Sequence, residues 1–127
     1  MMSKHTLALL QQIAHGIAVH FGNNCEVLVH DFTADYTNSS IVIIEHGNVT
    51  MRKIGDGPSH VVLEALHSDH KTLEDKLSYL TKTKDGRILK SSTMFIRGED
   101  DSIEAVLSIN FDITSMQMAE NVLQQLI

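Results

Sequence analysis

The sequence holds one cysteine, Cys25, and one proline, Pro58, among its 127 residues. A lone cysteine cannot form an internal disulfide, which is usual in a reducing compartment, so we expect a cytoplasmic location. Apolar runs such as 41–44 have only the length of a strand, whereas a membrane-spanning helix needs about 20 apolar residues. The first residues also lack a long apolar segment with a cleavage site, so no signal peptide is predicted.

Basic residues are absent from 98–127, where six acidic residues stand, and the whole chain has a net charge of −6. Proteins that bind nucleic acid directly usually carry a basic stripe, so this chain is not expected to do so. Its partners are expected to be proteins or small molecules. A hydrophobic content of 43% and a charged content of 20% are typical of one globular domain at this length.

Helical spacing of apolar residues marks both ends of the chain. It predicts an amphipathic helix within 1–22 and another over 114–127, the second beginning at Thr114 as its cap. A short helix is predicted over 61–67, with Ser59 as its cap. Between the terminal helices, 23–113 is predicted to form the body of a single domain.

Alternating and β-branched residues predict six extended segments. In the first, Cys25 and Val27 point to one face of the sheet, and Glu26 and His30 to the other. In the last, residues 103, 105, 107, 109 and 111 are predicted to share a face. The six segments are 25–32, 41–45, 48–52, 77–83, the stretch that follows Asp85-Gly86 up to residue 97, and 103–111.

This order of elements predicts an α+β fold. It consists of an antiparallel sheet of five strands, or of six segments, with flanking helices and terminal helices. The turn Asp85-Gly86 joins two of the strands, because glycine supplies the positive φ that tight hairpin turns need. Such a layout is that of PAS and GAF sensor domains.

Motifs spread over residues 7–116 carry a more specific resemblance. They are 21–31, 47–50 with Arg52, Ile54 and Gly55, then Tyr79, Thr81 and Thr83, Asp85-Gly86, 89–93 with 95–97, and 109–114. In this order and at this spacing they resemble the YheO-like PAS domain, the N-terminal half of a bacterial family of transcriptional regulators. The resemblance implies a sensor domain whose regulator binds DNA through a helix-turn-helix domain that is absent from this chain.

Three positions depart from the family pattern. Glycine is usual where this chain has Met51 and Ala105, and cysteine where it has Ser108. The larger side chains of Met51 and Ala105 predict a smaller pocket than the family pattern implies.

The segment 90–93 carries an amine and three hydroxyls where a core strand would carry aliphatic side chains. These groups could line a site for a small polar or anionic ligand, and the resemblance favours that interpretation. Alternatively, Ser91 and Thr93 lie on the solvent face of the strand while Ser92 packs inward. The candidate ligand-binding residues are Arg52, Tyr79, Lys90, Ser91, Ser92, Thr93 and Asn110.

No catalytic residue, metal or cofactor is predicted, so we do not expect an enzyme. Cys25 and His30 lie an odd number of positions apart and face opposite sides of one strand. Glu26 and His30 share a face but lie about 13 Å apart along it. His67 and His70 suit one helical face, yet no further cluster completes a tetrahedral metal site.

The terminal helices are candidates for pairing with a second copy of the chain, and we expect a homodimer. The alternative to a ligand-binding sensor is a pure dimerisation module with a filled core and no ligand. The candidate interface residues are Leu7, Leu10, Ile17, Met116, Ala119, Leu123 and Leu126.

Overall fold

The computed structural model describes residues 2–33 and 40–127. Its three helices and five strands confirm the predicted α+β class with a five-stranded antiparallel sheet. The elements are α1 (Lys4–Phe21), β1 (Cys25–Asp31), β2 (Ile41–Glu45), α2 (His60–Leu66), β3 (Lys76–Lys82), β4 (Ile88–Arg97), β5 (Ile103–Asp112) and α3 (Thr114–Leu126).

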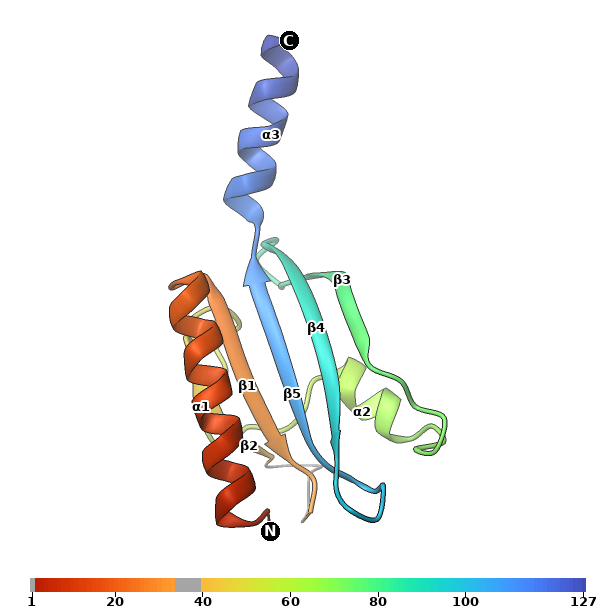
Figure 1. Cartoon of the computed structure of the whole chain (residues 1–127). Coiled ribbons are helices and arrows are strands. Elements are labelled where there is room, and N and C mark those ends of the chain that lie inside the picture. Colours follow the sequence, from red (N-terminus) through yellow and green to blue (C-terminus); the bar gives the residue numbers. More distant parts are fainter. Residues whose placement is uncertain (1, 34–39) are drawn as a thin grey trace.

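The strands are ordered β2-β1-β5-β4-β3, and every neighbouring pair is antiparallel (Figure 1). The last strand, β5, therefore lies in the middle, between β1 and β4. It pairs Asn110 with Glu26 on one side and with Ser91 on the other. This register brings polar residues from distant parts of the sequence into one row across the sheet.

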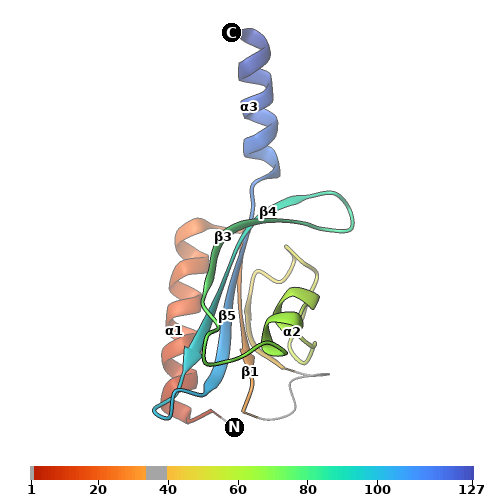
Figure 2. The same ribbon diagram turned by 90° about the vertical axis from the view of Figure 1, so that its right-hand side faces the viewer.

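Helices α1 and α2 lie on opposite faces of the sheet (Figure 2). On the α1 face, Cys25, Val27 and Val29 of β1 are buried in one cluster with Leu10 and other residues of α1. The other face of β1 is buried as well, so nearly every residue of this strand is inaccessible to water. The alternation predicted for the strand is confirmed.

Helix α1 begins after Ser3, whose hydroxyl accepts a hydrogen bond from the Thr6 amide at 3.1 Å. Its apolar stripe packs on the sheet of its own chain. Leu10 is 4% exposed, and Leu7 and Ile17 are half-buried against the same cluster. The core of the chain therefore already occupies Leu10, which contradicts its predicted place in a dimer interface, whereas the interface role of Leu7 and Ile17 stays a prediction.

The predicted strand over 48–52 was also wrong, since this segment forms consecutive turns. The Thr50 amide and hydroxyl both donate to the Glu26 carboxylate, at 3.1 and 2.6 Å, so the amide is not available for strand pairing. Met51 next to it has a φ of 62°, in the left-handed region that a strand does not use.

A β-bulge changes the predicted face of one residue of β5. The register shifts by one position between Ile96 and Arg97, which pair with Ala105 and Ile103. Ile103 consequently packs with Phe32 and Val106 on the α2 side, whereas Ala105 packs on the α1 side. The prediction that Ile103 and Ala105 share a face was wrong for this reason.

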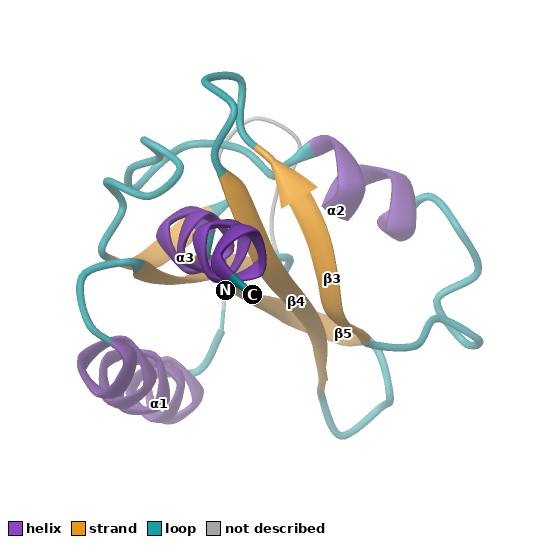
Figure 3. Ribbon diagram, turned by 90° about the horizontal axis from the view of Figure 1, so that it is seen from above, coloured by secondary structure: helices purple, strands orange, loops and turns teal. Residues whose placement is uncertain are grey.

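Helix α3 extends away from the sheet, beyond the end of β5 (Figure 1), and seen from above it stands end-on over the strands, with α1 and α2 to either side (Figure 3). Thr114 is its first residue and not its cap, contrary to prediction. The Asp112 carboxylate instead accepts hydrogen bonds from the Thr114 amide at 3.0 Å and from its hydroxyl at 2.6 Å. None of the α3 residues is buried. Among the described residues, no helix is both long enough and apolar enough to cross a membrane.

Candidate ligand-binding cleft

A cleft of about 710 Å³ lies on the α2 face of the sheet, opposite α1. Strands β3, β4 and β5 supply part of its wall, with the 50–52 turn, the start of α2 and the β3–β4 turn. Figure 2 shows the β3–β4 turn extending over the same side as α2. The lining residues are Thr50, Met51, Arg52, Ser59, His60, Val62, Tyr79, Thr81, Lys82, Thr83, Lys84, Asp85, Arg87, Leu89, Thr93, Ser108 and Asn110.

A row of hydrogen-bonded side chains crosses four strands beneath the cleft, and we call it the polar belt (Thr50, Glu26, Asn110, Ser91 and Thr81). Asn110 donates from Nδ2 to Glu26 Oε1 at 2.9 Å and accepts at Oδ1 from the Ser91 hydroxyl at 2.8 Å. Ser91 is in turn hydrogen-bonded to Thr81 at 2.9 Å. Buried polar groups need partners, and the belt supplies them without filling the space above it.

Tyr79 and Thr93 form a second polar contact in the cleft wall, with 2.8 Å between their hydroxyl oxygens. A β-bulge lies just before Tyr79, where Ser78 has a φ of 56° and its amide donates to the Ser92 hydroxyl at 2.9 Å. The bulge restores the alternation that places Tyr79 and Thr81 on the cleft side of β3.

The structure brings together some of the predicted ligand-binding residues and separates others. Arg52, Tyr79, Thr93 and Asn110 line the cleft, and Ser91 lies in the polar belt behind it. The solvent-face interpretation of Ser91 and Thr93 was wrong, because these residues are 1% and 3% exposed.

Lys90 and Ser92 do not belong to the cleft. Successive residues of a strand point to opposite faces, so these two lie on the side away from Ser91 and Thr93. Lys90 is exposed there, and Ser92 is hydrogen-bonded to Ser78. The prediction that 90–93 lines one site as a unit was therefore wrong.

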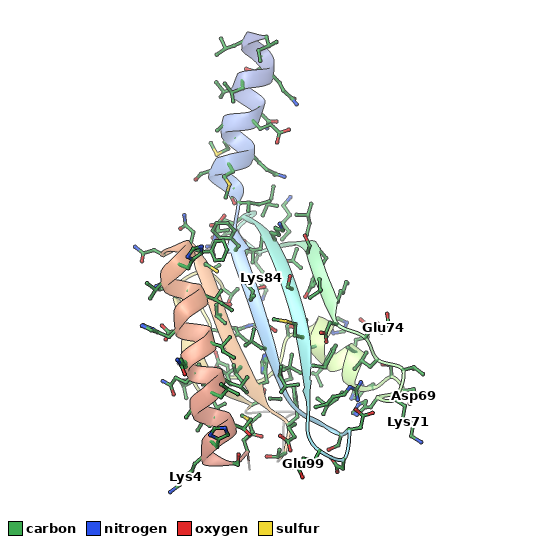
Figure 4. The ribbon with its side chains drawn as sticks, in the orientation of Figure 1. Lys4, Asp69, Lys71, Glu74, Lys84 and Glu99 are labelled. Atoms are coloured by element: carbon green, nitrogen blue, oxygen red, sulfur yellow. The ribbon has the colours of Figure 1, made fainter. Side chains whose placement is uncertain are left out.

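Charged residues of the cleft were largely missed from the sequence. Lys82, Lys84 and Arg87 join Arg52 in the lining, against one carboxylate, Asp85. Figure 4 shows Lys84 at the end of the sheet from which α3 extends. The hairpin 82–87 was read only as a turn, although its basic residues were visible in the sequence.

Arg87 connects the cleft to the start of α3. Its guanidinium bonds to Asp85 at 3.1 Å and lies 3.5 Å from Asp112, which is hydrogen-bonded to Thr114 at the start of α3. Burial acts to raise the pKa of Asp112, but hydrogen bonds from Thr114 and the Arg87 charge outweigh it, so the pKa is lowered. Asp112 is therefore held as a carboxylate between the two elements.

Two ionisable residues of β1, Cys25 and His30, are buried on opposite faces of the sheet. Cys25 packs in the α1-facing core, where burial and the nearby Glu26 charge raise the pKa of its thiol. His30 faces the other side, and burial together with the Arg52 charge lowers its pKa to about 4. Within the described residues, no group of three or more His, Cys, Asp or Glu is placed to hold a metal ion.

The three departures from the family pattern affect the cleft differently. Met51 is 79% exposed at its edge, and Ala105 is buried on the α1 face, so neither occupies the interior. The prediction that both reduce the pocket was wrong for Ala105, because β5 turns it to the other face. Ser108 lines the cleft.

Comparison with known proteins places this fold in a family. A family model described as the YheO-like PAS domain matches residues 1–127. The chain is 30% identical over 105 residues to the protein YheO of Escherichia coli (strain K12), covering 81% of this chain and 42% of YheO. A Haemophilus influenzae protein is 26% identical over 101 residues, covering 80% of this chain and 44% of that protein. The chain thus spans less than half the length of these relatives.

Solved structures support the fold assignment. The RNA-binding Light-Oxygen-Voltage receptor superposes with a TM-score of 0.54 at 17% identity, over 94% of this chain and 38% of that one. The dark structure of the blue-light photoreceptor Aureochrome1 LOV gives a TM-score of 0.50 at 13% identity, over 98% and 95%. At these identities the likeness establishes a PAS/LOV-like fold alone.

Proposed function

Because the chain belongs to the YheO-like PAS domain family, whose fold is that of sensory and regulatory domains, we propose that it is the sensor domain of a transcriptional regulator. Its role is to bind a small polar effector in the cleft beside α2. The regulator acts in the cytoplasm and contacts DNA through a helix-turn-helix domain outside this chain.

The observation that carries this proposal is the cleft itself. Its volume of about 710 Å³ lies within the range of roughly 300–1,000 Å³ that is usual for small-molecule sites. Apolar Val62 and Leu89 share its wall with Tyr79, Thr93 and Asn110. An apolar wall with a few fixed polar groups is the usual composition of such a site.

Effector binding matters to a regulator only if it favours one of two arrangements of the protein. We infer that these arrangements involve a homodimer formed through α3. Met116, Leu123 and Leu126 are all more than half exposed on this helix, and Ala119 is exposed as well. An amphipathic helix none of whose residues is buried is suited to pairing with the same helix of a second copy.

A thermal-shift screen with a panel of small polar metabolites of either charge tests effector binding. Binding to the folded state alone raises the melting temperature in a concentration-dependent way. S108L fills the cleft from its wall and is expected to abolish the response. S115L adds the same bulk at an exposed position of α3 and is the matched control. Two outcomes would support the alternative, a dimerisation module with a filled core and no ligand. One is an equal thermal shift in both variants, and the other is no thermal shift of the wild type with any compound of the panel.

Sedimentation equilibrium tests the dimer. The chain has a mass of 14.1 kDa, so the proposal requires a species of twice that mass at micromolar concentration. L123Q with L126Q is expected to shift the equilibrium to the monomer while the domain stays folded by circular dichroism, because both side chains lie outside its core. A wild-type chain that stays monomeric would contradict the proposal.

A further inference from the structure

Basic side chains gather at the cleft although the chain as a whole is acidic. Its net charge is −6, yet four of its ten Lys and Arg residues line this one cleft. Asp85 is the one carboxylate among the described lining residues. A cavity lined by charges of one sign raises the local concentration of ligands of the opposite sign. The excess of positive charge therefore favours an anion.

Most of these cations are not neutralised by the protein. Among the described residues, no ion pair involves Arg52, Lys82 or Lys84. The Glu26 carboxylate lies behind the cleft wall, where Thr50 and Asn110 already donate to both of its oxygens. Arg52 and Lys84 thus remain available to a ligand, whereas Lys82 pairs with Ile88 and by alternation lies on the same face as Lys90.

Arg87 differs from the other cations because it has carboxylate partners. Asp85 is largely exposed, with a side chain 65% accessible, whereas the Asp112 side chain is 16% accessible. Asp112 uses its other oxygen, Oδ1, to accept the two hydrogen bonds from Thr114. The Thr114 hydroxyl in turn accepts a hydrogen bond from the Ile88 amide at 2.9 Å. One guanidinium is therefore shared between the cleft wall and the first turn of α3.

The geometry points to a small carboxylic acid anion as the effector. The carboxylate of this effector competes with the Asp112 side chain for Arg87. Binding of the effector therefore loosens the start of α3. This inference rests on the proposed function of the cleft and names its ligand class and its route to α3. A guanidinium pairs with a planar carboxylate through two parallel hydrogen bonds, and the group displaced from Arg87 is itself a carboxylate. Val62 and Leu89 offer apolar surface to the carbon skeleton.

Isothermal titration calorimetry on the full chain tests the ligand class. The probes are mono- and dicarboxylates of roughly two to eight carbons, each paired with its neutral amide. At least one carboxylate is expected to bind about tenfold more tightly than its amide, since tenfold is the effect of a single charged contact of about 1.4 kcal/mol. If no carboxylate binds, or the amides bind equally well, the inference is overturned.

Three variants test the role of Arg87. R87Q is expected to weaken carboxylate binding about tenfold or more. R87K keeps the positive charge but loses the two parallel N–H donors of the guanidinium, so it is expected to weaken binding by a smaller factor. D112N keeps an oxygen for Thr114 but removes the competing charge, so it is expected to strengthen binding about threefold. K90Q removes a positive charge from the opposite face of β4 and should change affinity less than about twofold.

The response of α3 is read from amide hydrogen exchange. Saturating carboxylate is expected to speed exchange in the first turn of α3 in the wild type and not in R87Q. Melting temperatures verify that each variant is folded.

The affinities of the variants decide whether the effector competes with Asp112. Equal weakening by R87Q and K90Q, or a D112N affinity at or below that of the wild type, overturns this competition. One outcome separates the two proposals: no carboxylate binds, but neutral or cationic compounds of the wider panel bind to the wild type and not to S108L. In that case the carboxylate inference fails and the proposed function stands. If nothing in the panel binds, both fail.

Discussion

His30 gives the chain a stability that depends on pH in a defined direction. Its side chain is 0% exposed, its Nδ1 is hydrogen-bonded to the Ser40 hydroxyl at 2.7 Å, and its ring stacks on Phe32. Nε2 is buried without a hydrogen-bond partner among the described residues. Burial, with a smaller effect of the Arg52 charge, lowers the pKa of His30 to about 4 from 6.5. The folded protein therefore holds this imidazole neutral.

The direction of this pH dependence follows from the protons that the folded and the unfolded chain bind at His30. As the pH falls below about 6.5, the unfolded chain binds a proton at His30, while the folded chain does not until about pH 4. The contribution is thus fully present above about pH 6.5 and is lost as the pH falls toward about 4. At about 1.4 kcal/mol per unit of pKa, the whole interval corresponds to about 3 kcal/mol, of which about 2 kcal/mol is lost between pH 7 and pH 5.

Urea denaturation of the wild type and of H30N at pH 7 and pH 5 measures this contribution. Asparagine places a polar group near the position of Nδ1 and can keep the hydrogen bond to Ser40, but it does not titrate. The loss of unfolding free energy between the two pH values is expected to be about 2 kcal/mol smaller in H30N than in the wild type. H5N removes a histidine from an exposed position and is the matched control. Equal losses in H30N and the wild type would refute the assignment of this effect to His30.

Three further substitutions probe the belt and the backbone, each by chemical denaturation. N110A removes a hydrogen bond to buried Glu26 and another to Ser91, and should destabilise the domain by about 2–3 kcal/mol; a loss below about 0.5 kcal/mol would show that the belt contributes little. D112A removes two hydrogen bonds to Thr114, the first residue of α3, and should cost about 1 kcal/mol with lower helicity by circular dichroism, which unchanged helicity would contradict. M51G relieves a φ of 62° and should stabilise by about 1 kcal/mol, whereas a loss of stability would mean that the turn is not strained.

The sequence predicted the elements well because residue spacing follows their geometry. The helical spacing of α1 reflects burial of one face against the sheet, and alternation in β1 assigns residues to two faces that are both buried. The wrong strand at 48–52 shows where this fails. Its extended pattern was overridden by the Glu26 carboxylate, a partner 24 positions away that takes the Thr50 amide out of strand pairing.

The candidate site was predicted only in part, for a related reason. Alternation along β4 separates Ser91 and Thr93 from Lys90 and Ser92, so half of the polar cluster at 90–93 lies outside the cleft. Arg87 was missed because its significance depends on its distance to Asp112, which is set by the β4–β5 pairing and not by sequence spacing. Long-range register is the information that local patterns do not contain.

A sensor domain of this kind must communicate the occupancy of its cleft to α3. The most direct test is a titration of the ¹⁵N-labelled chain, followed by amide chemical shifts, with the compound that gives the largest thermal shift. We expect saturable shifts at Thr93, Ser108 and Asn110 together with shifts of the same midpoint at Thr114. Saturable shifts in the cleft with none in α3 would contradict the relay, and the absence of saturable shifts in the cleft would contradict the sensor itself.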